Sequence, residues 1–242
     1  MAGLRFVQAD LAQMRQARRA AQELLAERLD MLLFTAGILA GKQRAESPDG
    51  IELDMAVSCL SRFVMLREMA ERLGAQREAA QAKPRVFIMG FPGANQRGSL
   101  DDFNSERHYS LMIAHANTVI GNEALVLDSA RRWPQLNCYG LNPGLMKSNI
   151  RAAVLGQGSL RQKAVELLIG ALFPSVEEYS RSITPLLVSP DLEQHSGVMF
   201  NRHGEPIHAS RNLDAATVEK VVRNAEELMR KNNKTCVCKK GE

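Results

Sequence analysis

Short apolar runs alternate with longer amphipathic stretches through most of this chain, and this alternation constrains the fold more than any other feature of the sequence. Residues 31–37 (MLLFTAG) and 85–89 (RVFIM) are unbroken apolar runs without period-two alternation, the pattern of strands buried on both faces of a parallel sheet. Apolar residues at helical spacing fill the stretches between such runs. The sequence therefore predicts an α/β fold, a doubly wound parallel sheet with right-handed crossovers.

The other predicted elements continue this pattern. Residues 5–9 (RFVQA) form a short apolar strand that ends at Asp10, whose carboxylate is placed to cap the following helix. Residues 47–51 (SPDGI) are interpreted as the cap of the next helix. The remaining predicted helices are 11–29, 51–73, 109–133, 160–171, 175–189 and 214–231, and the remaining strands are 136–141 and 197–201. We expect one domain over residues 1–205, then a C-terminal helix and a disordered polar tail over residues 206–242.

Composition and charge exclude several classes of function. The net charge of +4 comes from Lys and Arg residues scattered among Asp and Glu, with no basic run interleaved with aromatic residues, so nucleic-acid binding is not indicated. No run reaches the ~18 apolar residues of a membrane span, and the N-terminal residues lack an apolar run of signal-peptide length. We therefore expect a soluble, cytoplasmic protein that binds neither nucleic acid nor membrane.

The four cysteines also indicate a cytoplasmic protein. Cys59 and Cys138 fall in predicted core elements, and Cys236 and Cys238 fall in the polar tail, which is the usage of a reducing environment. No second Cys or His pair completes a tetrahedral zinc site with the two tail cysteines. No metal is therefore expected.

Two glycine patterns are better interpreted as loops than as phosphate-binding turns. Gly90, Gly93 and Gly98 follow a strand but lack the G-x-G-x-x-G spacing. Gly37-x-x-x-Gly41-Lys42 is one residue short of a P-loop, and Gln43 replaces the Ser or Thr that would hold magnesium. The sequence as printed thus contains no glycine-rich turn of the kind that binds a dinucleotide pyrophosphate.

Four local matches, in the right order and spacing, resemble the short-chain dehydrogenase/reductase superfamily over residues 4–205. Residues 10–11 follow the first strand where that family contacts the adenine, and residues 35–37 match its Asn-Ala-Gly turn beneath the cofactor. Residues 87–90 occupy the strand that normally delivers a catalytic serine, and residues 139–148 (YGLNPGLMKS) match a Pro-Gly-x-x-x-Thr segment at the nicotinamide. The resemblance implies cofactor contacts by Asp10, Leu11, Thr35, Ala36, Gly37, Pro143, Gly144 and Ser148.

The resemblance implies a Rossmann-like sheet that lacks the family's first two strands, which come from the middle of its 3-2-1-4-5-6-7 order. Three outcomes are open: the true protein begins upstream, residues 5–9 slide in to pair with residues 31–37, or another chain covers the exposed edge. The family's cofactor is NAD(P). Because the missing turn would supply the N–H groups that hold its pyrophosphate, we expect NAD(P) binding to be weak or absent in this chain.

The family's catalytic residues are a Tyr, a Lys four residues on, a Ser and an Asn, and this chain departs from all of them. Tyr109 is followed four residues later by Ile113, and a register set on Ala116-Asn117 gives Ser110 and Ala114 instead. The serine position is Met89-Gly90, and the asparagine position is Ser58. The chain most resembles the divergent fungal secondary-metabolite reductase-like proteins, which also depart from this tetrad.

Tyr109 is the best candidate for the catalytic acid, with a simple packing role as the alternative. His108 and His115 flank the same helix, and a histidine could in principle replace the Tyr/Lys pair as the acid, but structural roles are favoured for both. The first functional hypothesis is an NAD(P)-dependent oxidoreductase that interconverts carbonyls and alcohols, impaired or altered, with a small-molecule substrate. The second is a non-redox protein on the same scaffold, either an interaction protein or a cofactor-free lyase or isomerase. By analogy with the family, residues 51–73 and 108–133 offer a homo-oligomer interface.

Overall fold

The computed structural model describes residues 4–78, 82–145 and 174–238. Its sheet has five strands in the order β1-β2-β3-β4-β5: β1 Met31–Phe34, β2 Arg85–Met89, β3 Asn137–Leu141, β4 Met199–Phe200 and β5 Pro206–Ile207. The first four strands are parallel, and β5 pairs antiparallel with β4. The predicted α/β fold with a mostly parallel sheet is confirmed. The antiparallel β5, only two residues long, was not predicted.

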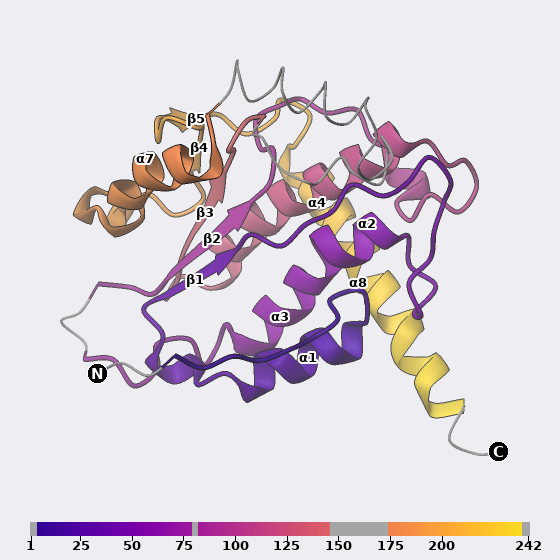
Figure 1. Cartoon of the computed structure of the whole chain (residues 1–242), viewed down its shortest axis with the longest axis horizontal. Coiled ribbons are helices and arrows are strands. Elements are labelled where there is room, and N and C mark those ends of the chain that lie inside the picture. The colour runs from indigo at the N-terminus through magenta and orange to yellow at the C-terminus, as the bar shows by residue number, and fades with distance from the viewer. Residues whose placement is uncertain (1–3, 79–81, 146–173, 239–242) are drawn as a thin grey trace.

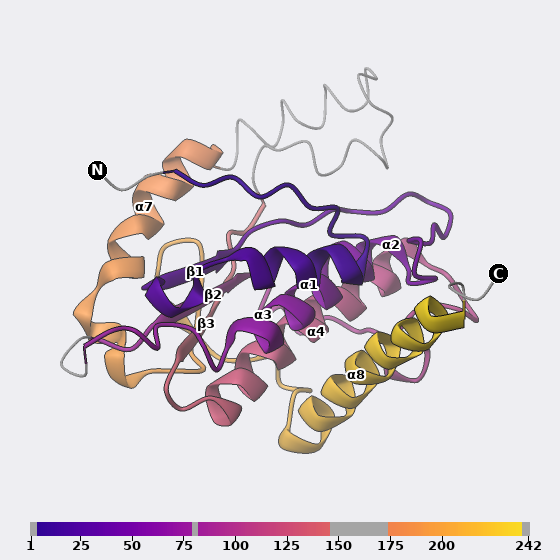
Figure 2. The same ribbon diagram turned by 90° about the horizontal axis from the view of Figure 1, so that it is seen from below.

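Helices cover the two faces of the sheet unequally (Figures 1 and 2). The helices α1, α3, α4 and α8 lie on one side, and α7 lies on the other. Their bounds are α1 Met14–Glu23, α2 Leu53–Met55, α3 Ser61–Met69, α4 Leu111–Arg132, α7 Val176–Val188 and α8 Ala215–Cys238, with a π-helical segment, η2, over Ala56–Leu60 between α2 and α3. The predicted helix at 160–171 lies outside the described residues.

Alternate residues of the central strands supply the two cores. Val86, Ile88 and Cys138 belong to the large apolar cluster under α1, α3, α4 and α8. Phe87 and Tyr139 point to the opposite face and belong to a smaller cluster with residues of α7. The rings of Phe87 and Tyr139 stack with centroids 5.1 Å apart. The two central strands are therefore buried on both faces, as their unbroken apolar character predicted.

The first predicted strand does not form. Residues 5–9 have no strand partner, and the side chains of Leu4 and Phe6 are 100% and 84% exposed. The sliding of this segment against residues 31–37 is therefore wrong. Within the described part of the chain no strand pairs with the outer edge of β1, and Leu33 is 40% exposed, so the expectation of burial on both faces fails for β1. A strand gains too little stability to form when no neighbouring strand pairs with its backbone.

The start of α1 is capped from a distant loop rather than from Asp10. The backbone N–H of Met14 donates to Oδ2 of Asp49 at 2.7 Å, whereas Oδ1 of Asp10 accepts the N–H of Ala12 in the turn before the helix. Residues 47–51 thus cap α1, and the cap of α2 is instead Glu52, which accepts the N–H of Met55. Both capping predictions named the wrong partner.

The C-terminal helix begins where it was predicted and ends later. Oδ1 of Asp214 accepts the N–H of Thr217 at 2.8 Å, a normal N-cap. The helix continues past the expected end at Lys231 to Cys238, so this part of the predicted disordered tail is helical. In the described residues, no helix has the length and apolar character needed to cross a membrane.

Candidate functional site

The carboxyl ends of β1, β2 and β3 bring three short segments to one edge of the sheet. These are residues 35–37, 90–93 and 142–144, and ligands of open α/β sheets bind in the crevice outside such an edge. The backbone N–H of Gly90 donates to Leu141 at 2.9 Å, and Nδ2 of Asn142 donates to Pro92 at 2.9 Å. The second and third segments are therefore tied to each other, and Arg62 joins the first segment to the end of β2. We call the three segments the ledge.

Five of the sequence-predicted cofactor residues lie on this ledge. Thr35, Ala36 and Gly37 are exposed, Pro143 is buried, and Gly144 has a φ of +68°, a left-handed conformation that suits glycine. The others are not placed with them: the carboxylate of Asp10 is used in its local turn, Leu11 packs against the large core, and Ser148 lies outside the described residues.

The buried guanidinium of Arg62 joins the carboxyl ends of β1 and β2. It extends from α3 and is 4% exposed. Nη2 donates to the carbonyl oxygen of Ala36 at 2.7 Å, and Nη1 donates to the carbonyl oxygen of Met89 and, at 3.0 Å, to Oδ1 of Asn122. Burial lowers the pKa of Arg62 to about 10, so the group stays charged at neutral pH. A full positive charge thus lies directly behind the ledge.

Arg62 is the inner end of a row of polar side chains between α2–α3 and α4. We call this row the polar seam: Asp54, Ser58, Arg62, His115 and Asn122. Nδ2 of Asn122 donates to the carbonyl oxygen of Ser58 at 2.8 Å, and Oγ of Ser58 accepts the N–H of Ile38 at 2.9 Å. The π-helical turn η2 lies in the middle of the seam, and isolated π turns are frequent at functional sites.

The outer end of the seam is an imidazole against a buried carboxylate. Nδ1 of His115 lies 2.8 Å from Oδ2 of Asp54, and the side chains are 27% and 1% exposed. Glu52, 1% exposed, lies two residues before Asp54. Burial raises the pKa of Glu52, although the hydrogen bond from the N–H of Met55 opposes this. Two buried carboxyl groups therefore approach the first turns of α4.

Tyr109 lies just before α4, and its hydroxyl donates to the carbonyl oxygen of Gly41 at 2.7 Å. Burial raises the pKa of Tyr109, and the negative charges of Glu52 and Asp54 raise it further. A tyrosine that acts as an acid through a neighbouring lysine needs the opposite shift. The surroundings of Tyr109 therefore favour the protonated phenol at neutral pH.

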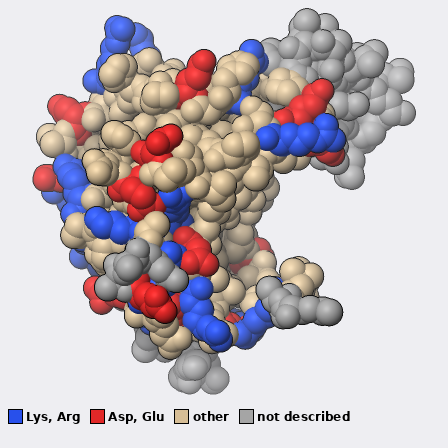
Figure 3. All heavy atoms as spheres, turned by 90° about the vertical axis from the view of Figure 1, so that its left-hand side faces the viewer, with Lys and Arg blue, Asp and Glu red and all other residues tan. Residues whose placement is uncertain are grey.

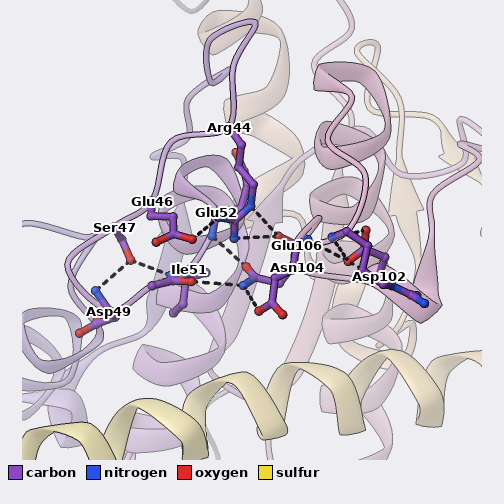
Figure 4. Close-up of polar contacts among 11 residues, drawn as sticks. Arg44, Glu46, Ser47, Asp49, Ile51, Glu52, Asp102, Asn104 and Glu106 are labelled. Carbon is purple, nitrogen blue, oxygen red and sulfur yellow. Dashed lines mark hydrogen bonds and ion pairs between the residues drawn. The ribbon is translucent and has the colours of Figure 1, made fainter.

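Two loops that flank Tyr109 are fastened together by side-chain amides and carboxylates (Figure 4). Oδ1 of Asn104 accepts the N–H of Glu52 at 2.8 Å, and its Nδ2 donates to Glu106 at 2.8 Å. Asp102 accepts the backbone N–H of Glu106 at 2.8 Å. These contacts fix the path of the chain into α4 and so position Tyr109 beside the start of α2.

The positions that correspond to the family's tetrad lack its chemistry. Gly90 and Ala114 have no functional group, and Ser110 is an exposed residue at the N-terminus of α4 whose side chain makes no capping bond. Ser58 is engaged with Ile38, and His108 is exposed, with its backbone N–H donating to Asp102.

Sequence reasoning missed Arg62 and Asp54. A signal was available, because Asp54 and Arg62, with Glu52, are the only charged residues in the otherwise mostly apolar stretch 51–66 of a predicted helix. A charge in such a helix is either at its exposed face or paired in the interior. Which of the two holds depends on residues of α4 far along the chain, and the sequence alone does not give that pairing.

Comparison with known proteins places the chain among oxidoreductases. It is 42% identical over 231 residues to an uncharacterised oxidoreductase of Saccharomyces cerevisiae, a match that covers 94% of this chain and 75% of that protein. It is 29% identical over 147 residues to a Streptomyces protein named as a daunorubicin C-13 ketoreductase, which covers 59% of this chain and 48% of that protein. No protein-family model matches the chain.

Solved structures share the fold at low sequence identity. An uncharacterised protein from Mycobacterium paratuberculosis matches with a TM-score of 0.62 at 19% identity, over 92% of this chain and 74% of that one. A short-chain dehydrogenase from Salmonella enterica matches with a TM-score of 0.53 at 18% identity, over 80% and 72%. A metagenomic blue fluorescent protein in complex with NADPH matches with a TM-score of 0.55 at 18% identity, over 81% and 73%.

The fold, the order of the matched segments and the yeast relative define the class of the protein. The chain belongs to the short-chain dehydrogenase/reductase superfamily. It is an oxidoreductase-like member of that superfamily.

Proposed function

We propose that the chain is an NAD(P)-dependent oxidoreductase that interconverts a carbonyl and an alcohol on a small molecule. The observation that carries the proposal is the ledge of residues 35–37, 90–93 and 142–144, backed by the charged guanidinium of Arg62. The ketoreductase name of one relative and the NADPH bound to one structural neighbour support this choice of chemistry. When bound, the nicotinamide would accept or supply a hydride.

The ledge fits the nicotinamide half of such a cofactor. Thr35, Ala36 and Gly37 expose a stretch of small side chains on which a flat ring could lie, and Pro143 and Gly144 border it two strands away. The positive charge of Arg62 would favour the electron-rich partner of the reaction. The printed sequence offers no glycine-rich turn for the pyrophosphate, so the affinity for the whole dinucleotide is expected to be low.

Tyr109 remains the candidate acid among the residues that the resemblance supplied. Its hydroxyl already donates a hydrogen bond to the carbonyl oxygen of Gly41, and its raised pKa keeps the phenol protonated at neutral pH. As a proton donor to an alkoxide it would act without the help of a lysine. Replacement of Tyr109 by Phe should lower turnover about 100-fold if the phenol is the acid, since general acid catalysis contributes at least that much.

Turnover of a panel of aldehydes and ketones at millimolar NADPH tests the proposal. Ala36→Leu places a larger side chain on the ledge, and because Ala36 is exposed, the fold should tolerate it. We expect slow turnover that falls at least ~10-fold in this variant, since the ring loses its position. Ala216→Leu, an exposed position at the start of α8, is the matched control. No turnover of any substrate would contradict the proposal.

A non-redox function on the same scaffold is the second candidate. It is favoured by the absence of functional groups at Gly90 and Ala114 and by the unpaired outer edge of β1 in the described structure. A lyase or isomerase would turn over its substrate without any nicotinamide. Equal rates in the presence and absence of NADPH would select this candidate over the first.

A further inference from the structure

The His115–Asp54 pair has the geometry of a proton-transfer dyad. The pair bridges α4 and α2, with 2.8 Å between Nδ1 and Oδ2. Asp54 is 1% exposed, and its other oxygen, Oδ1, has no hydrogen-bond partner among the described residues. A buried carboxyl group with one oxygen free is expensive unless a neighbouring donor stabilises the other oxygen. Nδ1 of His115 is the group placed to donate to it.

The pair fixes which ring nitrogen is basic. An ionised carboxylate can only accept, so beside the carboxylate form of Asp54 a neutral His115 ring carries its proton on Nδ1 and its lone pair on Nε2. No hydrogen bond of Nε2 occurs within the part of the chain that the structure describes, and the side chain is 27% exposed. An oriented imidazole with a free, reachable Nε2 is the arrangement of a general base.

The surroundings collect further groups that a substrate oxygen would meet. Glu52 and Asp54 both raise the pKa of Tyr109, and Arg44 lowers the pKa of both Glu52 and Tyr109, so these charges act within one small region. Tyr109 lies just before α4 and His115 lies near its start. Among the described residues no group of three or more His, Cys, Asp and Glu side chains is placed to hold a metal ion.

We propose that Nε2 of His115, oriented by Asp54, exchanges a proton with the hydroxyl or carbonyl oxygen of the substrate. This rests on the proposed oxidoreductase function for the hydride. In alcohol oxidation the substrate O–H bond breaks, the proton goes to Nε2, the C–H electron pair leaves as hydride to NAD(P)⁺, and the C=O bond forms. The imidazolium then gives its proton to water. His115, in place of Tyr109, is the catalytic residue in this step, and Asp54 is its positioning residue.

The tautomer of His115 tests the dyad without any cofactor or substrate. Ring nitrogen NMR of the full chain, with His115 assigned through His115→Gln, should find the proton of the neutral ring on Nδ1. Asp54→Asn should mix the two tautomers, because an amide can donate to the ring as well as accept from it. A neutral wild-type ring that carries its proton on Nε2 would overturn the dyad, whereas the oxidoreductase proposal would be unaffected.

Kinetics distinguish a catalytic histidine from a structural one. His115→Gln should lower kcat by about 100-fold to 10,000-fold with little change in KM, the usual contribution of a general base. Asp54→Asn should lower kcat too and alter its pH profile. Exposed His108→Gln is the matched control, with kcat unchanged. Full activity in His115→Gln would overturn the proposal, and if the chain has no turnover at all, the ring tautomer alone decides.

Discussion

Arg62 shows how a single buried residue can hold the edge of a sheet. Its guanidinium donates to the carbonyl oxygens that follow β1 and end β2 and to a side chain of α4, so three elements depend on one cation. Such a group is costly to bury, and the hydrogen bonds it makes offset that cost. The cation is retained where the ledge needs a fixed shape and a positive potential.

Replacement of Arg62 by Met should destabilise the chain by about 2–4 kcal/mol, because the carbonyl oxygens of Ala36 and Met89 and the buried Oδ1 of Asn122 lose their donor. Urea unfolding followed by circular dichroism measures the change. Arg15→Met, at an exposed position of α1, should change the stability by less than about 0.5 kcal/mol. Equal stabilities of the two variants would show that the guanidinium bonds are not important.

Asp102 gives a pH-dependent prediction. Burial raises its pKa, but hydrogen bonds from the N–H groups of His108, Arg107 and Glu106 outweigh burial and bring the pKa below the ordinary 3.8. A lowered folded pKa means that the carboxylate stabilises the fold above pH 3.8 and that this stability is lost as the pH falls through the folded pKa.

Asp102→Asn should therefore cost about 1–2 kcal/mol at pH 7, since the amide nitrogen cannot accept from the loop, and the difference from wild type should shrink below pH 3.8. Urea unfolding at pH 7 and pH 3 tests both parts. Glu219→Gln, at an exposed position of α8, is the control at each pH. A difference that grows as the pH falls would contradict the sign of the shift.

At the scale of elements, α4 meets the π turn η2 at a glycine. A Cβ on Gly121 would lie 2.4 Å from Sγ of Cys59 and 3.4 Å from Cζ of Phe103, well inside normal contact for sulfur. Only a residue without a side chain lets the two helices approach so closely. This approach is also what allows Asn122, the next residue, to reach Ser58 and Arg62.

Gly121→Ala should destabilise by about 1–3 kcal/mol through overpacking, although alanine is the better helix former. Cys59→Ala removes the sulfur and leaves a Cβ that would be 3.8 Å away. The double variant should therefore recover at least ~1 kcal/mol relative to the sum of the single variants in a double-mutant cycle. Strict additivity would mean that the two helices are not in the predicted contact.

Some elements were predictable because their information is local. The strands β2 and β3 are buried on both faces, and Asp214 is an N-cap that acts on its own helix. The cap of α1 was not predictable in this way, since Asp49 lies 35 residues along the chain from the N–H that it accepts. The ledge residues followed from the resemblance, whereas the pairing of Asp54 with His115 joins positions 61 residues apart and needs the packed helices to be seen.

At the scale of the whole molecule, the main physical feature is that the described helices cover the two faces of the sheet unevenly. One side is hollowed, and the exposed atoms along the hollow belong mostly to uncharged residues (Figure 3). Leu33 of β1 is 40% exposed at the sheet edge that no described strand pairs with. An uncovered apolar edge strand promotes pairing with another chain.

The purified 242-residue chain should therefore associate with itself as its concentration rises. Leu33→Lys should shift it toward the monomer in sedimentation velocity, because a lysine on an edge strand opposes pairing. Val188→Lys, 66% exposed at the end of α7, should leave the association unchanged. A wild-type chain that stays monomeric at every concentration would refute self-association through the edge of β1.

The central claim is that the chain keeps the nicotinamide side of a short-chain dehydrogenase site without a pyrophosphate turn. Isothermal titration of the 242-residue chain with NADPH and with reduced nicotinamide mononucleotide compares the affinity for the whole dinucleotide with the affinity for its nicotinamide half alone. The account predicts weak binding of both, with dissociation constants that agree within about threefold, because the adenosine half would add no contacts. Binding of NADPH about 100-fold more tightly than the mononucleotide would contradict it.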